Sequence, residues 1–569
     1  MKILQGLGIS PGIAIGPAFN FEPPVLSVAE SRCTDPQNEL ERLLDALEVA
    51  SRQIEALYET VQNELSPETA SIIETQQLFL QDPDLLSIVN QLILQDRFTA
   101  EYAWFKGVST FEEMLSSLQI GVFAERSVDL YDVGQRVLRI LLGKPISRPL
   151  NHPSILFSED LAPSIILGMD RENLLAFCTA QGSLTSHVAI LSRAMGIPAV
   201  AGIFSPNPDI ENTTSIIVDG QTGTVIVDPD TTTLEKFRLL STTSRQRDLT
   251  AFSLACQPAI TRDQHTVPVS ANIGSVDEAV AALQSGADGI GLFRTEYLFL
   301  GRKTPPSEED QYQYYTRILH QAGSKPVTAR TVDLGGDKPV EYIQTEKEAN
   351  PFLGLRGTRL ALKYPHILRD QLCALLRASV QGNLKIMFPL VSSIPEALAA
   401  RELLDECRSE LERRSFPFDP QMRVGVMIET PAAAMITDFL LNQFDFCSIG
   451  TNDLVQYTLA ADRTNPAVSS ASDALDPAVV RLIDQVIRLA HVAQKKVSLC
   501  GELAGDPTAV PLLLGLHLDE FSLNGRGIPL IKDRIRRFTL CEAEGIAAHV
   551  LSLHTVADIR KFLLSVELK

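Results

Sequence analysis

Two neighbouring stretches decide how the C-terminal half of the chain folds: V-G-V-M-I-E-T-P at residues 424–431 and D-F-C-S-I-G-T-N-D-L at residues 445–454. Each contains a short apolar run, the pattern of a strand that is buried on both faces. Each run ends at polar residues, with Glu429 after the first and Asn452 and Asp453 after the second. The two stretches therefore indicate neighbouring parallel strands that deliver polar side chains at their carboxyl ends.

The same rhythm continues outward on both sides of these two strands. Strand-like runs lie at residues 267–273, 288–293, 327–333, 385–391, 423–429, 445–450, 496–500 and 519–523. Helical stretches separate them, for example at residues 275–285, 307–322, 394–414 and 476–494. Eight alternating strands and helices predict an α/β fold, a (βα)₈ TIM barrel over residues 261–569. Such barrels carry their chemistry at the rim where the strands end.

Two acidic residues suggest what this rim binds. Glu429 and Asp453 follow adjacent strands, so the barrel would bring their carboxylates close together. Hard oxygen donors with open coordination positions suit Mg²⁺, which also takes water and substrate oxygens as ligands. The alternative is that each carboxylate pairs with a nearby arginine. The sequence therefore predicts a magnesium site with Glu429 and Asp453 as its ligands.

Four arginines indicate an anionic ligand at the same rim. Arg294 and Arg330 follow apolar strands, which places them at strand ends, and Arg356 and Arg463 lie in the loops and helices beyond. Arginine stays charged and binds phosphate and carboxylate groups with two parallel hydrogen bonds. Their convergence would favour a ligand with two or three negative charges, although Arg356 and Arg463 could equally form surface ion pairs.

Cys500 ends the strand-like run K-V-S-L-C at residues 496–500. A cysteine in a strand is usually a buried core residue. At the rim of a barrel, however, a thiol can transfer a proton to or from a bound substrate. Its position alone leaves both interpretations open.

The N-terminal half has a different organisation. Residues 1–20 and 145–230 contain short β-like runs, which predict a small α/β domain. Residues 21–144 are dominated by apolar residues at helical spacing, which predicts an all-helical subdomain inserted into that domain. Residues 231–260 read as a helical linker to the barrel.

His187 is the candidate for nucleophilic chemistry in this half. It lies in G-S-L-T-S-H-V-A-I-L, residues 182–191, where small and hydroxyl residues precede an apolar helix. The N-terminus of a helix can hold an oxyanion, and a neutral imidazole, with a pKa of about 6.5, is a nucleophile near neutral pH. Thr185 could bond the second ring nitrogen and fix the tautomer. The competing interpretation is a capping or structural histidine.

Composition narrows the class of protein. A chain of 569 residues is long enough for about three domains. The formal net charge of −20 argues against nonspecific binding to nucleic acid or to anionic membranes. No run of 18 apolar residues is present, so no membrane insertion is expected. The eight cysteines form no C-x-x-C pair, which fits a reduced, cytoplasmic protein.

Several long motifs resemble enzymes that use phosphoenolpyruvate (PEP) through a phosphohistidine. They are G-L-F-R-T-E-Y-L-F (291–299), R-T-V-D-L-G-G-D-K (330–338), N-P-F-L-G-L-R (350–356), M-I-E-T-P-A-A (427–433), D-F-C-S-I-G-T-N-D-L-V-Q-Y-T-L-A-A-D-R (445–463) and L-C-G-E-L-A-G-D (499–506). With the start G-I-S-P-G-I-A at residues 8–14, the chain is similar to the enzyme I family of the phosphotransferase system over essentially its whole length.

The resemblance implies a role for each candidate residue. PEP and Mg²⁺ would bind at the barrel rim, with Glu429 and Asp453 on the metal. Phosphate and carboxylate would be held by Arg294, Arg330 and Arg463 together with the backbone of Asn452, and Arg356 would lie close by. Asp453 would belong to this substrate-binding set as well as to the metal site. His187 would accept the phosphoryl group in a phosphohistidine domain, and Cys500 would protonate the enolate to pyruvate.

The resemblance also implies partners. The phosphoryl group would pass to the phosphocarrier protein HPr, which would dock on the helical subdomain, and the barrel would form a homodimer. Whether the pathway serves sugar uptake or regulation stays open. A pyruvate–phosphate dikinase or PEP synthase is disfavoured because residues 1–150 are too short for their ATP-binding domain and carry no Gly-rich P-loop.

One segment departs from the family pattern. Around the histidine that corresponds to His187, the family usually has the sequence Gly-Gly-Arg-Thr-Ser-His-Thr. Here Ser183 replaces the second glycine, Leu184 replaces the arginine, and Val188 replaces the small residue after the histidine. The lost arginine removes a positive charge next to the histidine. An alternative is therefore a degenerate regulatory relative that binds PEP or HPr with weak turnover.

Overall fold

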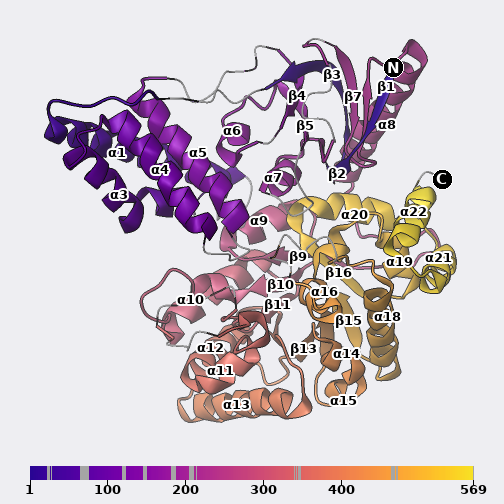
Figure 1. The fold of residues 1–569 in the computed structure, drawn as a ribbon. Helices are drawn as coiled ribbons and strands as arrows, with labels where there is room; N and C mark the ends of the chain where they lie inside the picture. The colour runs from indigo at the N-terminus through magenta and orange to yellow at the C-terminus, as the bar shows by residue number, and fades with distance from the viewer. Residues whose placement is uncertain are drawn as a thin grey trace. The chain divides into compact units, whose positions relative to one another are not determined.

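The computed structural model divides into two compact units (Figure 1), Met1–Gln246 with Arg463–Ser470 and Arg247–Asp462 with Ala471–Lys569. The residues that it describes are 1–569 except 22–25, 27, 65–72, 74–75, 118–122, 145–149, 151, 160, 181–186, 204–209, 213, 337, 339, 341, 344–347, 463–464, 466–467, 469–471 and 568–569.

The first unit contains an eight-stranded sheet in the order β1-β8-β7-β3-β4-β5-β6-β2. Its strands are β1 (Lys2–Gln5), β2 (Leu7–Ser10), β3 (Ile13–Asn20), β4 (Ser154–Ser158), β5 (Leu174–Thr179), β6 (Ala199–Ala201), β7 (Ser215–Asp219) and β8 (Thr224–Val227). Strands β7 and β8 form a hairpin, with Asp219 paired antiparallel to Thr224. Gly223 suits this turn, because its φ of 70° is unfavourable for residues with a side chain.

The chain between β3 and β4 is largely helical. Its helices are α1 (Pro36–Glu64), α3 (Pro83–Leu94), α4 (Ala100–Ser117) and α5 (Phe123–Leu141), and they enclose a core around the fully buried Trp104. These helices agree with the apolar residues at helical spacing in residues 21–144. Helices α6 (Pro163–Leu167), α7 (His187–Met195) and α8 (Thr231–Ser253) follow. The boundaries of the predicted parts, 1–20 with 145–230, 21–144, 231–260 and 261–569, stay a prediction.

The second unit is a closed barrel of eight parallel strands in the order β10-β11-β12-β13-β14-β15-β16-β9. The strands are β9 (Val269–Ile273), β10 (Ile290–Arg294), β11 (Val327–Arg330), β12 (Leu384–Phe388), β13 (Val424–Ile428), β14 (Phe446–Ile449), β15 (Lys496–Leu499) and β16 (Glu520–Asn524). The predicted TIM barrel is therefore confirmed.

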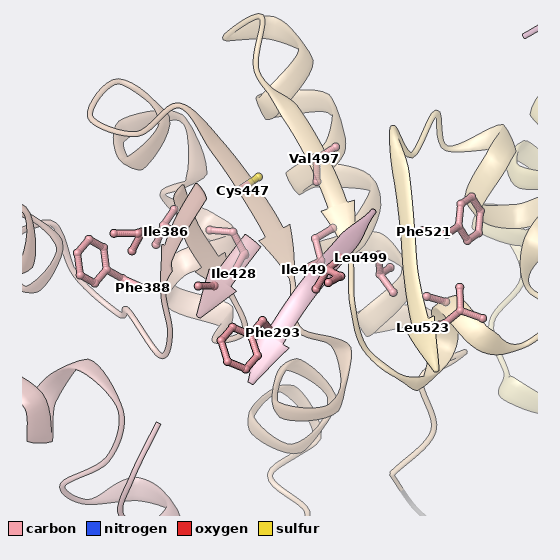
Figure 2. Close-up of a cluster of buried hydrophobic side chains, with 14 of the residues drawn as sticks. Phe293, Ile386, Phe388, Ile428, Cys447, Ile449, Val497, Leu499, Phe521 and Leu523 are labelled. Carbon is pink, nitrogen blue, oxygen red and sulfur yellow. The ribbon is translucent and has the colours of Figure 1, made fainter. Parts of the chain in front are cut away.

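Helices surround the barrel strands. They are α9 (Val276–Gln284), α10 (Glu308–Ala322), α11 (Thr358–Lys363), α12 (Pro365–Ala378), α13 (Ile394–Arg413), α14 (Pro431–Met435), α15 (Thr437–Leu441), α16 (Thr451–Leu459), α18 (Pro477–Val492), α19 (Val510–Gly515), α20 (Ile528–Ile535), α21 (Leu540–Ser552) and α22 (Val556–Glu567). Figure 2 shows part of the core of this unit, with Ile428, Ile449, Leu499 and Phe521 contributed by successive strands. Burying these side chains fixes which residues of each strand point toward the barrel interior. Within the described part of the chain, no helix is both long and apolar enough to span a membrane.

Five predicted strands extend too far at their carboxyl ends. The runs at 327–333 and 385–391 give strands that already end at Arg330 and Phe388, and the runs at 423–429, 445–450 and 496–500 give strands that end one residue early, at Ile428, Ile449 and Leu499. Pairing between β11 and β12 stops at Arg330 opposite Met387, so the residues beyond leave the barrel wall. Apolar residues such as Val332 and Val391 continue the pattern because they are buried in the loops. The rim is consequently built from loop residues as well as strand ends.

Candidate active site at the barrel rim

Five predicted site residues lie at the carboxyl ends of five barrel strands. Arg294 and Arg330 are the last residues of β10 and β11, Glu429 follows β13 directly, and Cys500 follows β15. Asp453 lies in the first turn of α16, which begins two residues after β14. Parallel strands end at the same edge, so the barrel places all five at one rim.

Arg330 is held by two buried carboxylates. Its Nη2 lies 2.5 Å from Glu296 Oε1 and 3.4 Å from Asp333 Oδ2, and the arginine is only 6% exposed. Burial alone would lower the pKa of Arg330, but Glu296 and Asp333 outweigh it and raise that pKa. Lys338 adds a second cation, with Nζ 2.7 Å from Glu296 Oε1. The rim therefore keeps a charged guanidinium in a fixed orientation.

Arg356 joins two carboxylates in the interior. Its Nη1 and Nη2 donate to both oxygens of Asp453 at 2.8 and 3.0 Å, and its Nε and Nη2 donate to Asp333 at 3.2 Å each. The side chain of Arg356 is 1% exposed. Its ion pairs are therefore buried and do not lie at the surface. Tyr457 lies 3.4 Å from Nη1 and donates to Phe352 O at 2.6 Å, which links α16 to the loop before α11.

Asp333 connects these two groups of charges. Burial would raise its pKa, but Arg330, Arg356 and Lys338 together hold the pKa well below its usual range. Asp333 is therefore ionised at every physiological pH and ties the arginine at the end of β11 to the arginine before α11. The result is a continuous buried network of alternating charge from Glu296 to Asp453.

Glu429 has a different environment from Asp333. It is 2% exposed, and its Oε1 accepts a hydrogen bond from the backbone of Leu390 at 2.5 Å. Burial raises the pKa of Glu429 to about 8, and the negative charge of Asp453 adds to the effect, while Arg330 opposes it. The carboxylates of Glu429 and Asp453 thus lie near each other. The positive charge around Glu429 is too small to offset its burial and the charge of Asp453, so the protonated form of Glu429 is favoured.

The donor set at Glu429 and Asp453 fits Mg²⁺. Both residues offer hard carboxylate oxygens, and a divalent cation would compensate the repulsion that raises the pKa of Glu429. Among the described residues, no group of three or more His, Cys, Asp and Glu side chains is arranged to hold a metal. Mg²⁺ normally keeps several ligands from water and substrate, so two carboxylates are sufficient for it.

Cys500 is buried at the same rim. It is 5% exposed, and its Sγ lies 3.6 Å from Ile449 O. Burial raises the pKa of the thiol to about 11, and the negative charge of Glu429 contributes to the increase. The thiol is therefore protonated at neutral pH, which is the state that a proton donor needs.

Of the other predicted residues, Asn452 lies at the same rim, His187 lies in the first unit, and two lie outside the described residues. Asn452 uses its side-chain oxygen to accept from the backbone of Glu502 at 3.0 Å, which connects α16 to the turn after Cys500. Arg463 and Thr185 lie outside the described residues. His187 is the first residue of α7, and Val188 after it is buried in the core of the α/β part.

Sequence reasoning missed three residues that complete the network: Glu296, Lys338 and Tyr457. Each lies within a quoted motif, but only the fold shows its partners. Glu296 gave a positional signal, because in F-R-T-E it stands two positions after Arg294, close to the carboxyl end of β10 where the rim lies. Lys338 and Tyr457 gave no comparable signal.

Three family models match the chain. They are described as PEP-utilising enzyme, N-terminal (residues 5–126), PEP-utilising enzyme, mobile domain (150–223), and PEP-utilising enzyme, PEP-binding domain (250–540). The last of these spans the barrel strands and every rim residue described above.

Curated relatives match along the whole chain. Phosphoenolpyruvate-protein phosphotransferase of Priestia megaterium is 39% identical over 566 residues, covering 99% of both chains. The protein of the same name from Bacillus subtilis (strain 168) is 39% identical over 565 residues, with the same coverage. A solution NMR structure of an Enzyme I protein (nEIt) covers 42% of this chain and 99% of its own, at 33% identity and a TM-score of 0.36. The matches along the full length show that the chain belongs to the phosphoenolpyruvate–protein phosphotransferases, the enzyme I family of PEP-utilising enzymes.

Proposed function

We propose that this chain transfers the phosphoryl group of PEP to His187 and from there to a histidine of HPr, releasing pyruvate, as the first step of the PEP-dependent phosphotransferase system. The observation that carries the proposal is the buried network at the rim. It fixes Arg330 and Asp453 in one connected set of ion pairs, with Glu429 and Cys500 beside it. This is the arrangement that a small, multiply charged acid requires.

The arginines bind and orient PEP in this proposal. Arg294 and Arg330 supply guanidinium groups for the phosphate, and Arg463 with the backbone at Asn452 and Asp453 holds the carboxylate. Phosphoryl transfer demands little covalent chemistry from the protein, so positioning and charge neutralisation provide most of the rate. Arg330 is already held in place by Glu296 and Asp333, so its side chain needs little rearrangement when the substrate binds.

Glu429 and Asp453 would hold Mg²⁺, which supplies charge neutralisation on the phosphate when it is bound. Asp453 meanwhile keeps its bonds to Arg356, so the carboxylate is fixed before any ligand arrives. Glu429 is buried, so its carboxylate is itself held out of bulk water. Both residues thus act by holding charge in place.

Cys500 completes the reaction by moving a proton. When the bond between phosphorus and the enol oxygen breaks, the electron pair stays on the enolate. The Cys500 Sγ–H then gives its proton to the terminal carbon of that enolate, which forms the methyl group of pyruvate. The thiolate left behind regains a proton from water, so the enzyme returns to its starting state.

Family membership supports a proposal about partners and location. HPr would dock on the helical part of the first unit, and two chains would associate through their barrels. The eight cysteines are all free, which supports a reduced, cytoplasmic setting.

Labelled PEP tests the proposal. Full-length protein incubated with [³²P]PEP and Mg²⁺ should acquire acid-labile label, and peptide mapping should place it on the segment that contains His187. Pyruvate should appear in equal amount. Label on another residue would refute the assignment of His187, and pyruvate without label would point to simple hydrolysis.

The protonation state of Cys500 gives a second prediction. With a pKa of about 11, only roughly one thiol in 3,000 is a thiolate at pH 7.5, and the thiolate is the reactive form. Iodoacetamide should therefore label Cys500 far more slowly than the exposed Cys256 and Cys541. The rate at Cys500 should rise about tenfold per pH unit until it levels near pH 11. Mass spectrometry measures all three sites at once, and equal rates at pH 7.5 would contradict the raised pKa.

A degenerate regulatory relative is the second candidate. Val188 stands in place of the family's small residue and packs in the apolar core with Leu191. In that case PEP would bind at the rim with normal affinity, but the label on His187 would stay there when HPr is added.

A further inference from the structure

The turn that carries Cys500 is held by side chains from two other parts of the barrel. Asn272 on β9 donates from Nδ2 to the carbonyl of Cys500 at 2.9 Å. Asn452 on α16 accepts from the backbone of Glu502 at 3.0 Å. Between them Gly501 packs so closely that a Cβ would lie 1.7 Å from Thr451 Oγ1. The thiol therefore starts from a backbone that is fixed on both sides.

Asn272 is itself fixed by a buried hydroxyl. Ser522 on β16 donates from Oγ to Asn272 Oδ1 at 2.6 Å and is fully buried. Figure 2 shows Phe521 and Leu523, the neighbours of Ser522 on its strand, in the apolar cluster of this unit. Because side chains alternate along a strand, Ser522 faces the opposite side, the barrel interior. Ser522 thereby sets which way the amide of Asn272 points.

The neighbouring strand leaves room for this pair. Gly291 on β10 faces Ser522, and a Cβ at that glycine would lie 2.3 Å from Ser522 Oγ. An alanine there would collide with the hydroxyl. The absence of a side chain at Gly291 thus leaves space for Ser522, which bonds Asn272, and Asn272 in turn bonds the carbonyl of Cys500.

We infer that Asn272 and Ser522 are positioning residues for proton transfer, a pair that aims the Cys500 thiol at the enolate carbon after the phosphoryl group has left. The hydrogen bonds of the pair run from Ser522 to Asn272 and from Asn272 to the carbonyl of Cys500, so the pair serves the proton transfer that follows the phosphoryl transfer. The inference rests on the proposed role of Cys500 as proton donor. General acids contribute roughly 10²–10⁴-fold, and small misplacements of a reacting group lose a large share of that.

Separating the two halves of the reaction tests the inference. In a single turnover with [³²P]PEP and Mg²⁺, label on the protein reports phosphoryl transfer, and lactate dehydrogenase detects only the keto form of pyruvate. Wild-type protein should show both signals together. Asn272→Ala and Ser522→Ala should acquire label at close to the wild-type rate, with pyruvate delayed about tenfold or more as free enol converts slowly in weakly buffered solution.

Asn524→Ala is the matched control. Asn524 lies opposite Asn272 in the register of β16 with β9, but its side-chain oxygen accepts from the backbone of Arg526 and makes no bond to Cys500. This variant should behave like wild type. If Asn272→Ala shows no delay, or slows both signals equally, the inference is wrong, since a purely structural residue would affect both halves. Absence of label in both Asn272→Ala and Ser522→Ala would also overturn it.

Cys500→Ala separates this inference from the proposed function. Delayed pyruvate in Cys500→Ala without delay in Asn272→Ala would leave the proton donor intact and reject only the positioning pair. Simultaneous label and pyruvate in Cys500→Ala would instead remove Cys500 from the mechanism.

Discussion

Glu429→Gln is expected to abolish labelling of the protein by PEP, with a loss of roughly 10³-fold or more in rate. The amide keeps the shape of the side chain and can still accept the bond from Leu390, which lies 2.5 Å from Glu429 Oε1. It removes the negative charge that Mg²⁺ requires. The loss of labelling would therefore be caused by the missing charge at residue 429 and not by altered packing.

Two measurements make the Glu429 prediction specific. Thermal unfolding of Glu429→Gln should match or exceed that of wild type, because burial and the charge of Asp453 already disfavour the ionised carboxylate. Titration with Mn²⁺, followed by its electron paramagnetic resonance signal, should show weakened metal binding. A variant that labels at the normal rate would show that Glu429 is not a metal ligand.

Arg356→Ala is expected to destabilise the barrel by about 3–5 kcal/mol, because removing one partner leaves buried charges unpaired. Arg356 is 1% exposed and makes four hydrogen bonds to Asp333 and Asp453. Both carboxylates would remain buried, and Asp453 would lose the group that orients it. Labelling by PEP should therefore fall together with stability.

Arg359→Ala provides the comparison for Arg356. Arg359 lies on α11 and pairs with Glu396 at 2.8 Å, but its side chain is 37% exposed. Solvent-exposed ion pairs contribute about 0–1 kcal/mol, so this variant should unfold almost like wild type. Calorimetry of the full chain measures both, and the transition that PEP shifts upward identifies the barrel. Equal losses in the two variants would contradict the importance of the buried network.

The sequence predicts the barrel well because parallel strands are buried on both faces. Runs such as V-G-V-M-I at 424–428 can be recognised as strands without knowing which strands they pair with. The polar residues that follow such runs mark the rim. The placement of Arg294, Arg330, Glu429 and Cys500 at that rim follows from the same pattern.

Side-chain partners could not be predicted in the same way. Arg356 lies 97 residues from Asp453 in the chain, and their contact depends on how the loop between β11 and α11 folds back. The ion pair expected for Arg356 at the surface is buried, and its role toward a ligand stays a prediction. Asn272 and Ser522 gave no signal either, because a single polar residue in a strand does not reveal which backbone it bonds.

Transfer of label from the protein to HPr tests whether His187 passes a phosphoryl group from PEP to the carrier. Wild-type protein is first labelled with [³²P]PEP and Mg²⁺, freed of excess PEP, and mixed with HPr; His187→Ala, carried through the same steps, is the control. Acid-labile label should leave the wild-type protein and appear on HPr in equal amount, while His187→Ala should carry none. Wild-type protein that takes no label from PEP, or keeps its label in the presence of HPr, would contradict this role of His187.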